Sequence, residues 1–267
     1  MSNDNNAEIS QDPWHSLKQF TPARIALGRA GMSLTTRACL DFQLAHALAR
    51  DAVNIPLDLT KVAQHLQAQG YQTLCLQSQA ENQSMYLQRP DLGRLLCSSA
   101  LTALQQTLPL QADVVIVVAD GLSSKAIEQH AEPLITLLLP ELQASGYRLA
   151  PVCLVKHGRV AVGDAIAEQY SARLCIILIG ERPGLSSPDS MGIYFTYQAK
   201  SGISTDADRN CISNIHKSGL SYEQAVKKLL FLIKAAEQLT FSGVNLKDET
   251  TDAALNNQQE QEGFLLK

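Results

Sequence analysis

The chain has 267 residues, of which 45% are apolar and 18% charged, and its net charge is −4. This length predicts one or two domains, at about 150 residues each, and the apolar content excludes a wholly disordered chain. No apolar run reaches the roughly 18 residues that a membrane-spanning helix needs, and a slightly acidic chain is a poor partner for nucleic acid. The six cysteines show no C-x-x-C spacing, which favours reduced thiols in a cytosolic protein over a zinc site.

The two ends of the chain are polar, and the region after the first end has helical patterns. Residues 1–14 and 247–267 contain too few apolar residues to offset the entropy of ordering, so we expect a mobile leader and a mobile tail. Residues 15–88 form a mainly helical N-terminal region, with helices over 37–53 and 58–69 and β-like pieces over 71–76 and 84–88. The first helix, capped at Thr35 or Thr36, carries one apolar stripe of Leu40, Leu44, Ala47 and Leu48.

Residues 89–246 alternate strands with helices. Continuous apolar runs predict strands buried on both faces over 114–119 and 173–180, a further strand over 148–155, and an edge strand over 191–197. Helices are expected from Pro90 to about 108, over 123–145 with a break or kink at Pro133 and Pro140, over 163–170 and over 222–239. The sequence therefore predicts an α/β fold: a Rossmann-like, parallel-sheet C-terminal domain preceded by a small helical N-terminal domain.

Polar loops follow the three predicted buried strands. They are residues 120–123, starting with Asp120; residues 156–160, which contain His157; and residues 180–184, which begin and end with Gly180 and Gly184. Ligands of open parallel sheets bind beyond the carboxyl ends of the strands, so we expect these loops to meet around one crevice. A fourth segment, 206–216, is dense in hydrogen-bonding groups and has weak periodicity, so we expect another loop there.

Each of these loops also has an ordinary structural explanation. The glycines are compatible with simple strand-to-helix turns, and Glu181 with Arg182 is compatible with a surface ion pair of little consequence. Cys211 is compatible with a buried inert thiol, and its spacing from His216 does not by itself establish a catalytic pair. For His157 we expect a solvent-exposed loop position.

Familiar catalytic signatures are missing from the sequence. It contains no G-x-x-x-x-G-K-[ST] phosphate loop, no G-x-G-x-x-G after the first buried strand, no G-x-S-x-G and no H-E-x-x-H. A Rossmann-like sheet with polar crevice loops and no such signature favours a ligand-holding subunit over a self-sufficient enzyme.

An ordered set of motifs nevertheless resembles a known family. The motifs are Thr21-Pro-Ala-Arg24, Gly28-Arg-Ala-Gly31, Arg89-Pro-Asp-Leu-Gly-Arg94, Asp120-Gly-Leu-Ser123, Gly158-Arg-Val160, Gly180-Glu-Arg-Pro-Gly-Leu185 and Asp208-Arg-Asn-Cys-Ile-Ser-Asn-Ile-His216. Together they resemble the small (light) subunit of ethanolamine ammonia-lyase, and the resemblance covers about residues 14–246.

The resemblance implies an adenosylcobalamin-dependent carbon–nitrogen lyase that converts ethanolamine to acetaldehyde and ammonia by a radical rearrangement. A TIM-barrel large subunit would carry the substrate, and this chain would complete the cobalamin site at the subunit interface of a hetero-oligomer. The implied cobalamin-binding residues are Val160, Glu181 and Cys211, with no catalytic residue and no metal ligand in this chain. The implied location is the cytoplasm or the interior of a bacterial microcompartment, and the short polar segment before Trp14 favours the cytoplasm.

Other interpretations follow from the same loops. By charge alone, Arg159, Arg182 and Arg209 are candidates to bind the phosphate of the cofactor's nucleotide tail. A stand-alone α/β enzyme for small molecules would use Asp120 and the turn from Gly180 to Gly184. A pure assembly protein would use the loops only to pack against a partner. Separately, Arg89, Arg94 and the helical N-terminal region are a candidate docking surface for the large subunit, with an ordinary solvated helix as the alternative.

Overall fold

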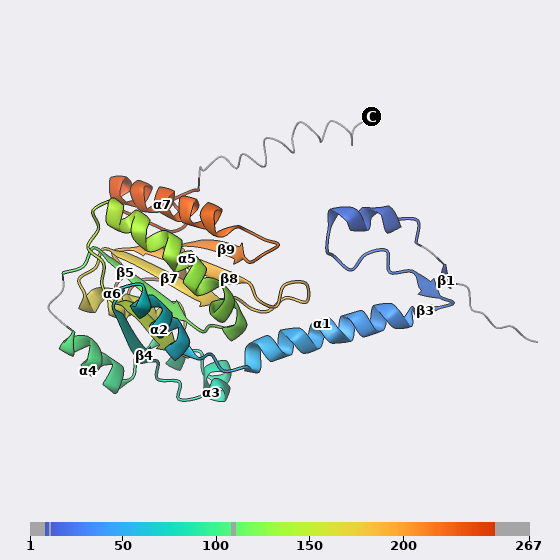
Figure 1. Ribbon diagram of the computed structural model, residues 1–267, viewed down its shortest axis with the longest axis horizontal. Coiled ribbons are helices and arrows are strands. Elements are labelled where there is room, and N and C mark those ends of the chain that lie inside the picture. Colours follow the sequence, from blue (N-terminus) through green and yellow to red (C-terminus); the bar gives the residue numbers. More distant parts are fainter. Residues whose placement is uncertain (1–8, 11, 108–110, 249–267) are drawn as a thin grey trace, which may run out of the picture.

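A six-stranded sheet organises the chain from residue 73 onward (Figure 1). The structure is a computed structural model, and it describes residues 9–10, 12–107 and 111–248. In this part of the chain the strand order is β4-β6-β5-β7-β8-β9. Neighbours from β4 to β7 are parallel, whereas β8 and β9 are antiparallel additions at one edge. The strands are β4 (Thr73–Gln77), β5 (Val114–Ala119), β6 (Val152–Lys156), β7 (Leu174–Gly180), β8 (Met191–Tyr197) and β9 (Arg209–Ile215).

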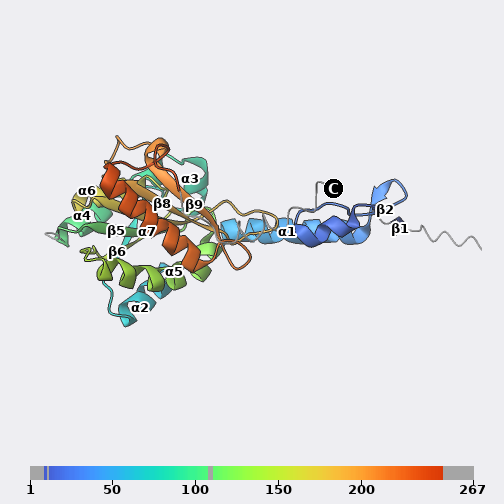
Figure 2. The same cartoon turned by 90° about the horizontal axis from the view of Figure 1, so that it is seen from above.

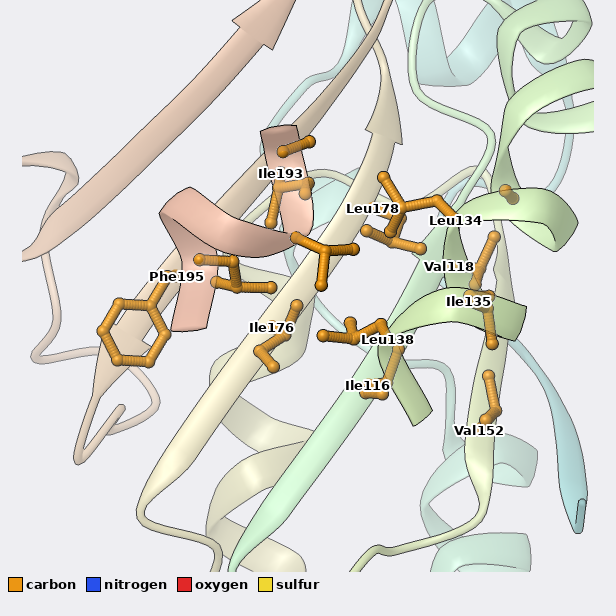
Figure 3. Packing of buried hydrophobic residues seen from close by; sticks show 14 of the residues in the cluster. Ile116, Val118, Leu134, Ile135, Leu138, Val152, Ile176, Leu178, Ile193 and Phe195 are labelled. Carbon is orange, nitrogen blue, oxygen red and sulfur yellow. The ribbon is translucent and has the colours of Figure 1, made fainter. Parts of the chain in front are cut away.

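Helices cover both faces of this sheet and give it two apolar layers. One face packs against α2 (Leu59–Ala68), α5 (Ser124–Ala144) and α7 (Tyr222–Leu239), and the other against α4 (Ser98–Gln106) and α6 (Val162–Gln169). Figure 3 shows Leu134 and Leu138 of α5 lying on strand residues such as Ile176. Every residue of β5 and β7 is buried, as expected for strands covered on both sides. The predicted α/β class with a Rossmann-like sheet is confirmed.

The first part of the chain forms an arm that extends away from the sheet (Figures 1 and 2). This N-terminal arm, described at residues 9–10 and 12–54, contains β1 (Ile9–Ser10), a 3₁₀ helix η1 (His15–Phe20), β2 (Arg29–Ala30), β3 (Ser33–Leu34) and α1 (Thr36–Asn54). The Thr35 side chain caps α1, as predicted. At its base, the Gln83 side chain donates a hydrogen bond to the Val53 carbonyl at 2.9 Å.

The predicted apolar stripe of α1 exists, but the described part of the chain does not cover it. Leu40, Leu44 and Leu48 are 57%, 61% and 43% exposed. Further exposed large apolar side chains of the arm are Trp14, Leu17, Phe20, Met32, Leu34 and Phe42. An apolar surface of this extent is typical of an interaction site.

Several local predictions about helices were wrong. Residues 84–88 belong to helix α3 (Gln83–Gln88), which Asn82 caps, rather than to a β-like piece. The helix expected from Pro90 begins only at Ser98, after the short 3₁₀ helix η2 (Leu92–Arg94). Helix α5 continues through Pro133 and Pro140, so neither proline breaks it.

The edge of the sheet also differs from the prediction. Strand β8 is an inner strand, because β9 pairs with its outer side. Residues 206–216, expected as a loop, contain η3 (Asp206–Asp208) and the whole of β9. Strand β9 is an edge strand that buries only Arg209, Ile212 and Ile215, so its sequence lacks the apolar run of a central strand.

Two of the predicted segments fall largely outside the described residues. The leader (1–14) is described only at 9–10 and 12–14, and the tail (247–267) only at 247–248. Strand β4 lies within the predicted N-terminal region (15–88), yet it pairs with β6 in the main sheet. The boundaries between the four predicted segments stay a prediction. Among the described residues, no helix is both long and apolar enough to cross a membrane.

Replacing a buried and an exposed leucine tests this packing. Leu138 is fully buried between α5, to which it belongs, and the sheet, so we expect Leu138→Ala to lower the free energy of unfolding by about 2–5 kcal/mol. The matched control is Leu40→Ala on the exposed side of α1, which should change it by less than about 0.5 kcal/mol. Urea unfolding followed by circular dichroism measures both, and equal effects would contradict the described core.

Candidate functional site

The carboxylate of Asp120 fastens two of the predicted loops together at the carboxyl edge of the sheet. Asp120 directly follows β5 and is 3% exposed. Its Oδ2 accepts the backbone N–H of His157 at 2.8 Å, and its Oδ1 accepts the N–H groups of Gly158 at 3.1 Å and Gly121 at 3.0 Å. A buried charge requires such donors in place of water. The loop after β6 is thereby held against the loop after β5.

The loop after β7 joins the same cluster through two glycines. The N–H of Leu122 donates to the Gly180 carbonyl at 2.9 Å. Gly121 has φ +60°, and a Cβ at this position would lie 2.3 Å from the Gly180 oxygen, so the approach requires glycine. The predicted convergence of the three loops is confirmed.

His157 is buried, so the prediction of a solvent-exposed position is wrong. It is 7% exposed and has a left-handed backbone with φ +56°. Its Nδ1 lies 3.4 Å from Asp120 Oδ2, and its ring packs beside that of Tyr86, with 6.1 Å between the centroids. The backbone bond to Asp120 holds His157 in this unusual conformation.

The chain's own residues fill the crevice between β5 and β6. Helices α5 and α6, which follow these adjacent strands, cover opposite faces of the sheet. Open α/β sheets usually bind ligands in the crevice between two such strands. Here the N–H of Arg159 donates to the Gly93 carbonyl at 2.7 Å, and its Nη2 donates to the Tyr86 carbonyl at 3.2 Å. The guanidinium also lies 4.3 Å from the centre of the Tyr86 ring. The motif from residue 89 to 94 therefore contributes to the structure of this edge.

Glu181 lies at the end of β7 and reaches across β8. Its Oε2 accepts the Ser190 hydroxyl at 2.5 Å and the Asn214 N–H at 3.3 Å. Its Oε1 lies over Gly192, where a Cβ would be only 2.8 Å away. No described residue donates a hydrogen bond to Oε1, so this half-buried carboxylate retains an acceptor for another molecule.

Cys211 lies on a part of the sheet that no helix among the described residues covers. It pairs across β9 and β8 with Tyr194, and the side chains of the next residues on both strands, Ile212 and Ile193, enter the core on the opposite face. Cys211 is exposed and Tyr194 is half-buried. We call the surface formed by Tyr194 and Cys211, next to the Glu181 side chain that covers Gly192, the β8–β9 surface.

The titrating groups of this surface are neutral near pH 7. Burial of its sulfur raises the pKa of the Cys211 thiol, and the negative Glu181 adds to this effect, while Tyr194 partly offsets it. Burial also raises the pKa of Tyr194 to about 12. His216 is bound to the Asn214 side chain, with Nε2 2.8 Å from its Oδ1. A thiol that stays protonated is a poor nucleophile, so a Cys211–His216 catalytic pair has no support.

Val160 lies just before α6, the helix that an ion pair joins to the start of β9. Val160 is half-buried and packs against the apolar cluster beneath α6. In the first turn of this helix, Asp164 forms an ion pair with Arg209 of β9, with 2.7 Å between Oδ2 and Nη2. The structure thus places Glu181 and Cys211 on the same surface, whereas Val160 lies on the segment leading into α6, which the Asp164–Arg209 pair joins to β9.

The three arginines considered for a phosphate differ in their availability. The Arg209 side chain is 1% exposed and bound to Asp164, so that prediction is wrong. Arg159 is held by Tyr86 and Gly93, as described above, whereas Arg182 is exposed.

In the described part of the chain, no group of three or more His, Cys, Asp or Glu residues could hold a metal ion.

Sequence reasoning missed three contributors to this surface. Tyr194 lies on an alternating strand, so its orientation could have been inferred from Ile193 and Phe195, which face the core. Gly192 and Asp164 carry no local signal, because their importance depends on Glu181 and Arg209, which are distant in sequence.

Comparisons with known proteins agree on one family. A family model described as ethanolamine ammonia-lyase light chain (EutC) matches residues 11–247. The ethanolamine ammonia-lyase small subunit of Azotobacter vinelandii is 52% identical over 250 residues, which cover 92% of both chains. That of Ralstonia nicotianae is 51% identical over 248 residues, also 92% of both. That of Pseudomonas putida F1 is 50% identical over 258 residues, which cover 96% of this chain and 94% of the relative.

Replacing the carboxylate of Asp120 with an amide tests its part in holding the loops. In Asp120→Asn the amide nitrogen cannot accept a backbone N–H, so we expect the free energy of unfolding to fall by about 1–3 kcal/mol. Asp58→Asn is the matched control, because Asp58 is an exposed cap of α2 and asparagine caps helices equally well. Denaturant unfolding of both variants provides the measurement, and an unchanged Asp120→Asn would refute this account of the loop cluster.

Proposed function

The chain belongs to the ethanolamine ammonia-lyase light-chain family, and we propose that it completes an adenosylcobalamin site at its contact with the large subunit. As a small subunit of this lyase, it takes part in ethanolamine breakdown within a complex. The observation that carries the proposal is the uncovered β8–β9 surface, which presents Cys211 beside a free acceptor oxygen of Glu181.

The residues around this surface fit the chemistry of a corrinoid. Such a cofactor has a broad ring, amide groups on its rim and a nucleotide tail. Glu181 Oε1 can accept a hydrogen bond from an amide or a ribose hydroxyl, and half-buried Val160 offers an apolar contact. Cys211 contributes a small, polarizable, neutral thiol. When bound, adenosylcobalamin supplies the radical chemistry, while the protein provides position and electrostatics.

This chain positions and does not transfer protons in the proposed mechanism. Both oxygens of Asp120 accept backbone hydrogen bonds, so Asp120 is not free to act as a general base. This removes the main residue of the alternative, a stand-alone enzyme that uses Asp120 and the turn from Gly180 to Gly184. We propose that the large subunit carries the substrate, and that the complex works in the cytoplasm or inside a bacterial microcompartment.

The N-terminal arm is our candidate for the main contact with the large subunit. Its exposed apolar side chains, among them Leu40, Leu44 and Trp14, would gain about 25 cal/mol for each Å² buried. The arm is anchored to the sheet domain through Gln83, and Arg24 donates to the Leu185 carbonyl at 3.2 Å. A partner bound to the base of the arm would therefore lie close to the 180–184 loop, from which Glu181 extends.

The decisive experiment is a cobalamin titration of the complex with the large subunit. We expect Glu181→Gln to weaken adenosylcobalamin binding about tenfold, since a hydrogen bond to a charged group contributes about 1.5–3 kcal/mol. Glu168→Gln on the exposed side of α6 is the isosteric control and should bind like the wild type. The absorbance spectrum of the cofactor provides the dissociation constants.

The alternatives predict other results in the same experiment. If Glu181→Gln leaves cofactor affinity unchanged but weakens association of the two subunits, the chain is an assembly protein and the cofactor proposal is wrong. Ethanolamine deamination by this chain without the large subunit would favour a stand-alone enzyme.

A charge placed on the arm tests the proposed subunit contact. We expect Leu44→Lys to weaken association with the large subunit by about tenfold or more, because an interface cannot bury the new charge without a partner. Ile203→Lys is the control: Ile203 is 71% exposed on a turn of the sheet domain, and its replacement should have no effect. Sedimentation velocity of the mixed subunits measures both, and equal association of Leu44→Lys and wild type would exclude this face of α1.

A further inference from the structure

A buried ion pair joins helix α6 to the edge strand β9. Arg209 donates from Nη2 and Nη1 to the two carboxylate oxygens of Asp164, both at 2.7 Å. The side chains of Arg209 and Asp164 are 1% and 2% exposed. Nη1 also donates to the Thr196 hydroxyl at 3.1 Å. Such two-pronged geometry fixes direction as well as distance.

Stability alone is a weak reason for burying this pair. Removing two charges from water costs about as much as their attraction returns, and well-packed apolar residues often replace such pairs without loss. The pair instead fixes the position of α6 relative to β9. Among the described residues, no other hydrogen bond joins α6 to β9.

The two elements joined by this pair carry two residues of the proposed cofactor site. Val160 lies four residues before Asp164 and two residues before the start of α6. Cys211 lies two residues after Arg209, and alternate residues of a strand share a face. The strand register agrees, because Arg209 pairs with Thr196 and Cys211 with Tyr194 along β8. The Asp164–Arg209 ion pair therefore lies on the same face of β9 as Cys211, two residues nearer the start of the strand.

We infer that Asp164 and Arg209 are positioning residues, which hold Val160 and Cys211 at the separation that the bound cofactor requires. This inference rests on the proposed function. Neither residue touches the cofactor: both side chains are buried where α6 meets the start of β9, and they act through the segment before α6 and through β9. Arg209 is thus a structural partner of the site and not the phosphate ligand that its charge suggests.

The test separates positioning from stability by using a variant that removes the pair without leaving a buried charge alone. In the double variant Asp164→Leu/Arg209→Met, apolar side chains replace both charges, so we expect near wild-type unfolding in urea. Adenosylcobalamin binding by the complex with the large subunit should nevertheless weaken at least about tenfold, the lower end of what losing an orienting partner costs at metal sites. Arg209→Lys keeps the positive charge opposite Asp164 but not the two-pronged geometry, so it should show a smaller loss of cofactor affinity.

A control and a second readout make the result specific. Leu138→Ala lowers stability from the opposite face of the sheet and should leave cofactor affinity unchanged. Hydrogen exchange of the complex without cofactor should increase in residues 158–166 in the double variant and Arg209→Lys but not in Leu138→Ala. Should the double variant fail to fold, Arg209→Lys decides on the same two measurements.

Two outcomes would overturn the inference. One is wild-type cofactor affinity in the double variant or, if it does not fold, in Arg209→Lys. The other is a cofactor affinity that falls only in proportion to the loss of folding stability. In that case Leu138→Ala would weaken cofactor binding as well. If Glu181→Gln weakens binding while the pair variants do not, the positioning role is wrong and the proposed function stands. If Glu181→Gln has no effect either, the proposed function itself fails.

Discussion

One buried carboxylate fixes the geometry on which the candidate site depends. Three backbone N–H groups, from the loops after β5 and β6, converge on Asp120, and burial strengthens each of these bonds. Gly121 then brings the same turn against Gly180, so the position of Glu181 follows from that of Asp120. Three loops, which would otherwise be the most variable part of such a fold, form one unit with the sheet below them. The acceptor oxygen of Glu181 is therefore presented from a rigid base.

The open surface beside Glu181 is a consequence of topology. Parallel neighbours need a crossover connection, usually a helix, and those helices cover both faces of the sheet as far as β7. Strands β8 and β9 are antiparallel and add width to the sheet without adding an α-helix between them. Helix α7 covers one face of these strands, while the other stays open at Cys211. A site at this place needs no special cavity, because the helix layer ends before the sheet does.

The sequence reveals those parts of the structure that have a local cause. Strands β5 and β7 were predicted correctly because burial on both faces demands an uninterrupted apolar run, and the loop cluster because parallel strands end at one edge. Strand β9 was missed because an edge strand with one open face retains polar residues, which are typical of loops. Arg209 was misjudged since its partner, Asp164, lies 45 positions away, and a lone arginine in a sequence indicates solvent. The exposed stripe of α1 has regular helical spacing, but that spacing does not say which chain covers it.

Two kinds of interaction have different roles in such a subunit. Large apolar side chains on the arm contribute association free energy in proportion to the area that a partner covers, whatever its detailed shape. The buried charges, Asp120 and the Asp164–Arg209 pair, fix distances and directions, and the ion pair does so while contributing little net stability. This matters for a chain that we propose to supply neither acid, base nor nucleophile, since a misplacement of about 1 Å far from the reacting atoms can slow a reaction about 100-fold. Under this proposal, the chain contributes to the reaction rate only by holding the cofactor accurately. That role explains why buried polar pairs lie close to a surface with so few catalytic groups.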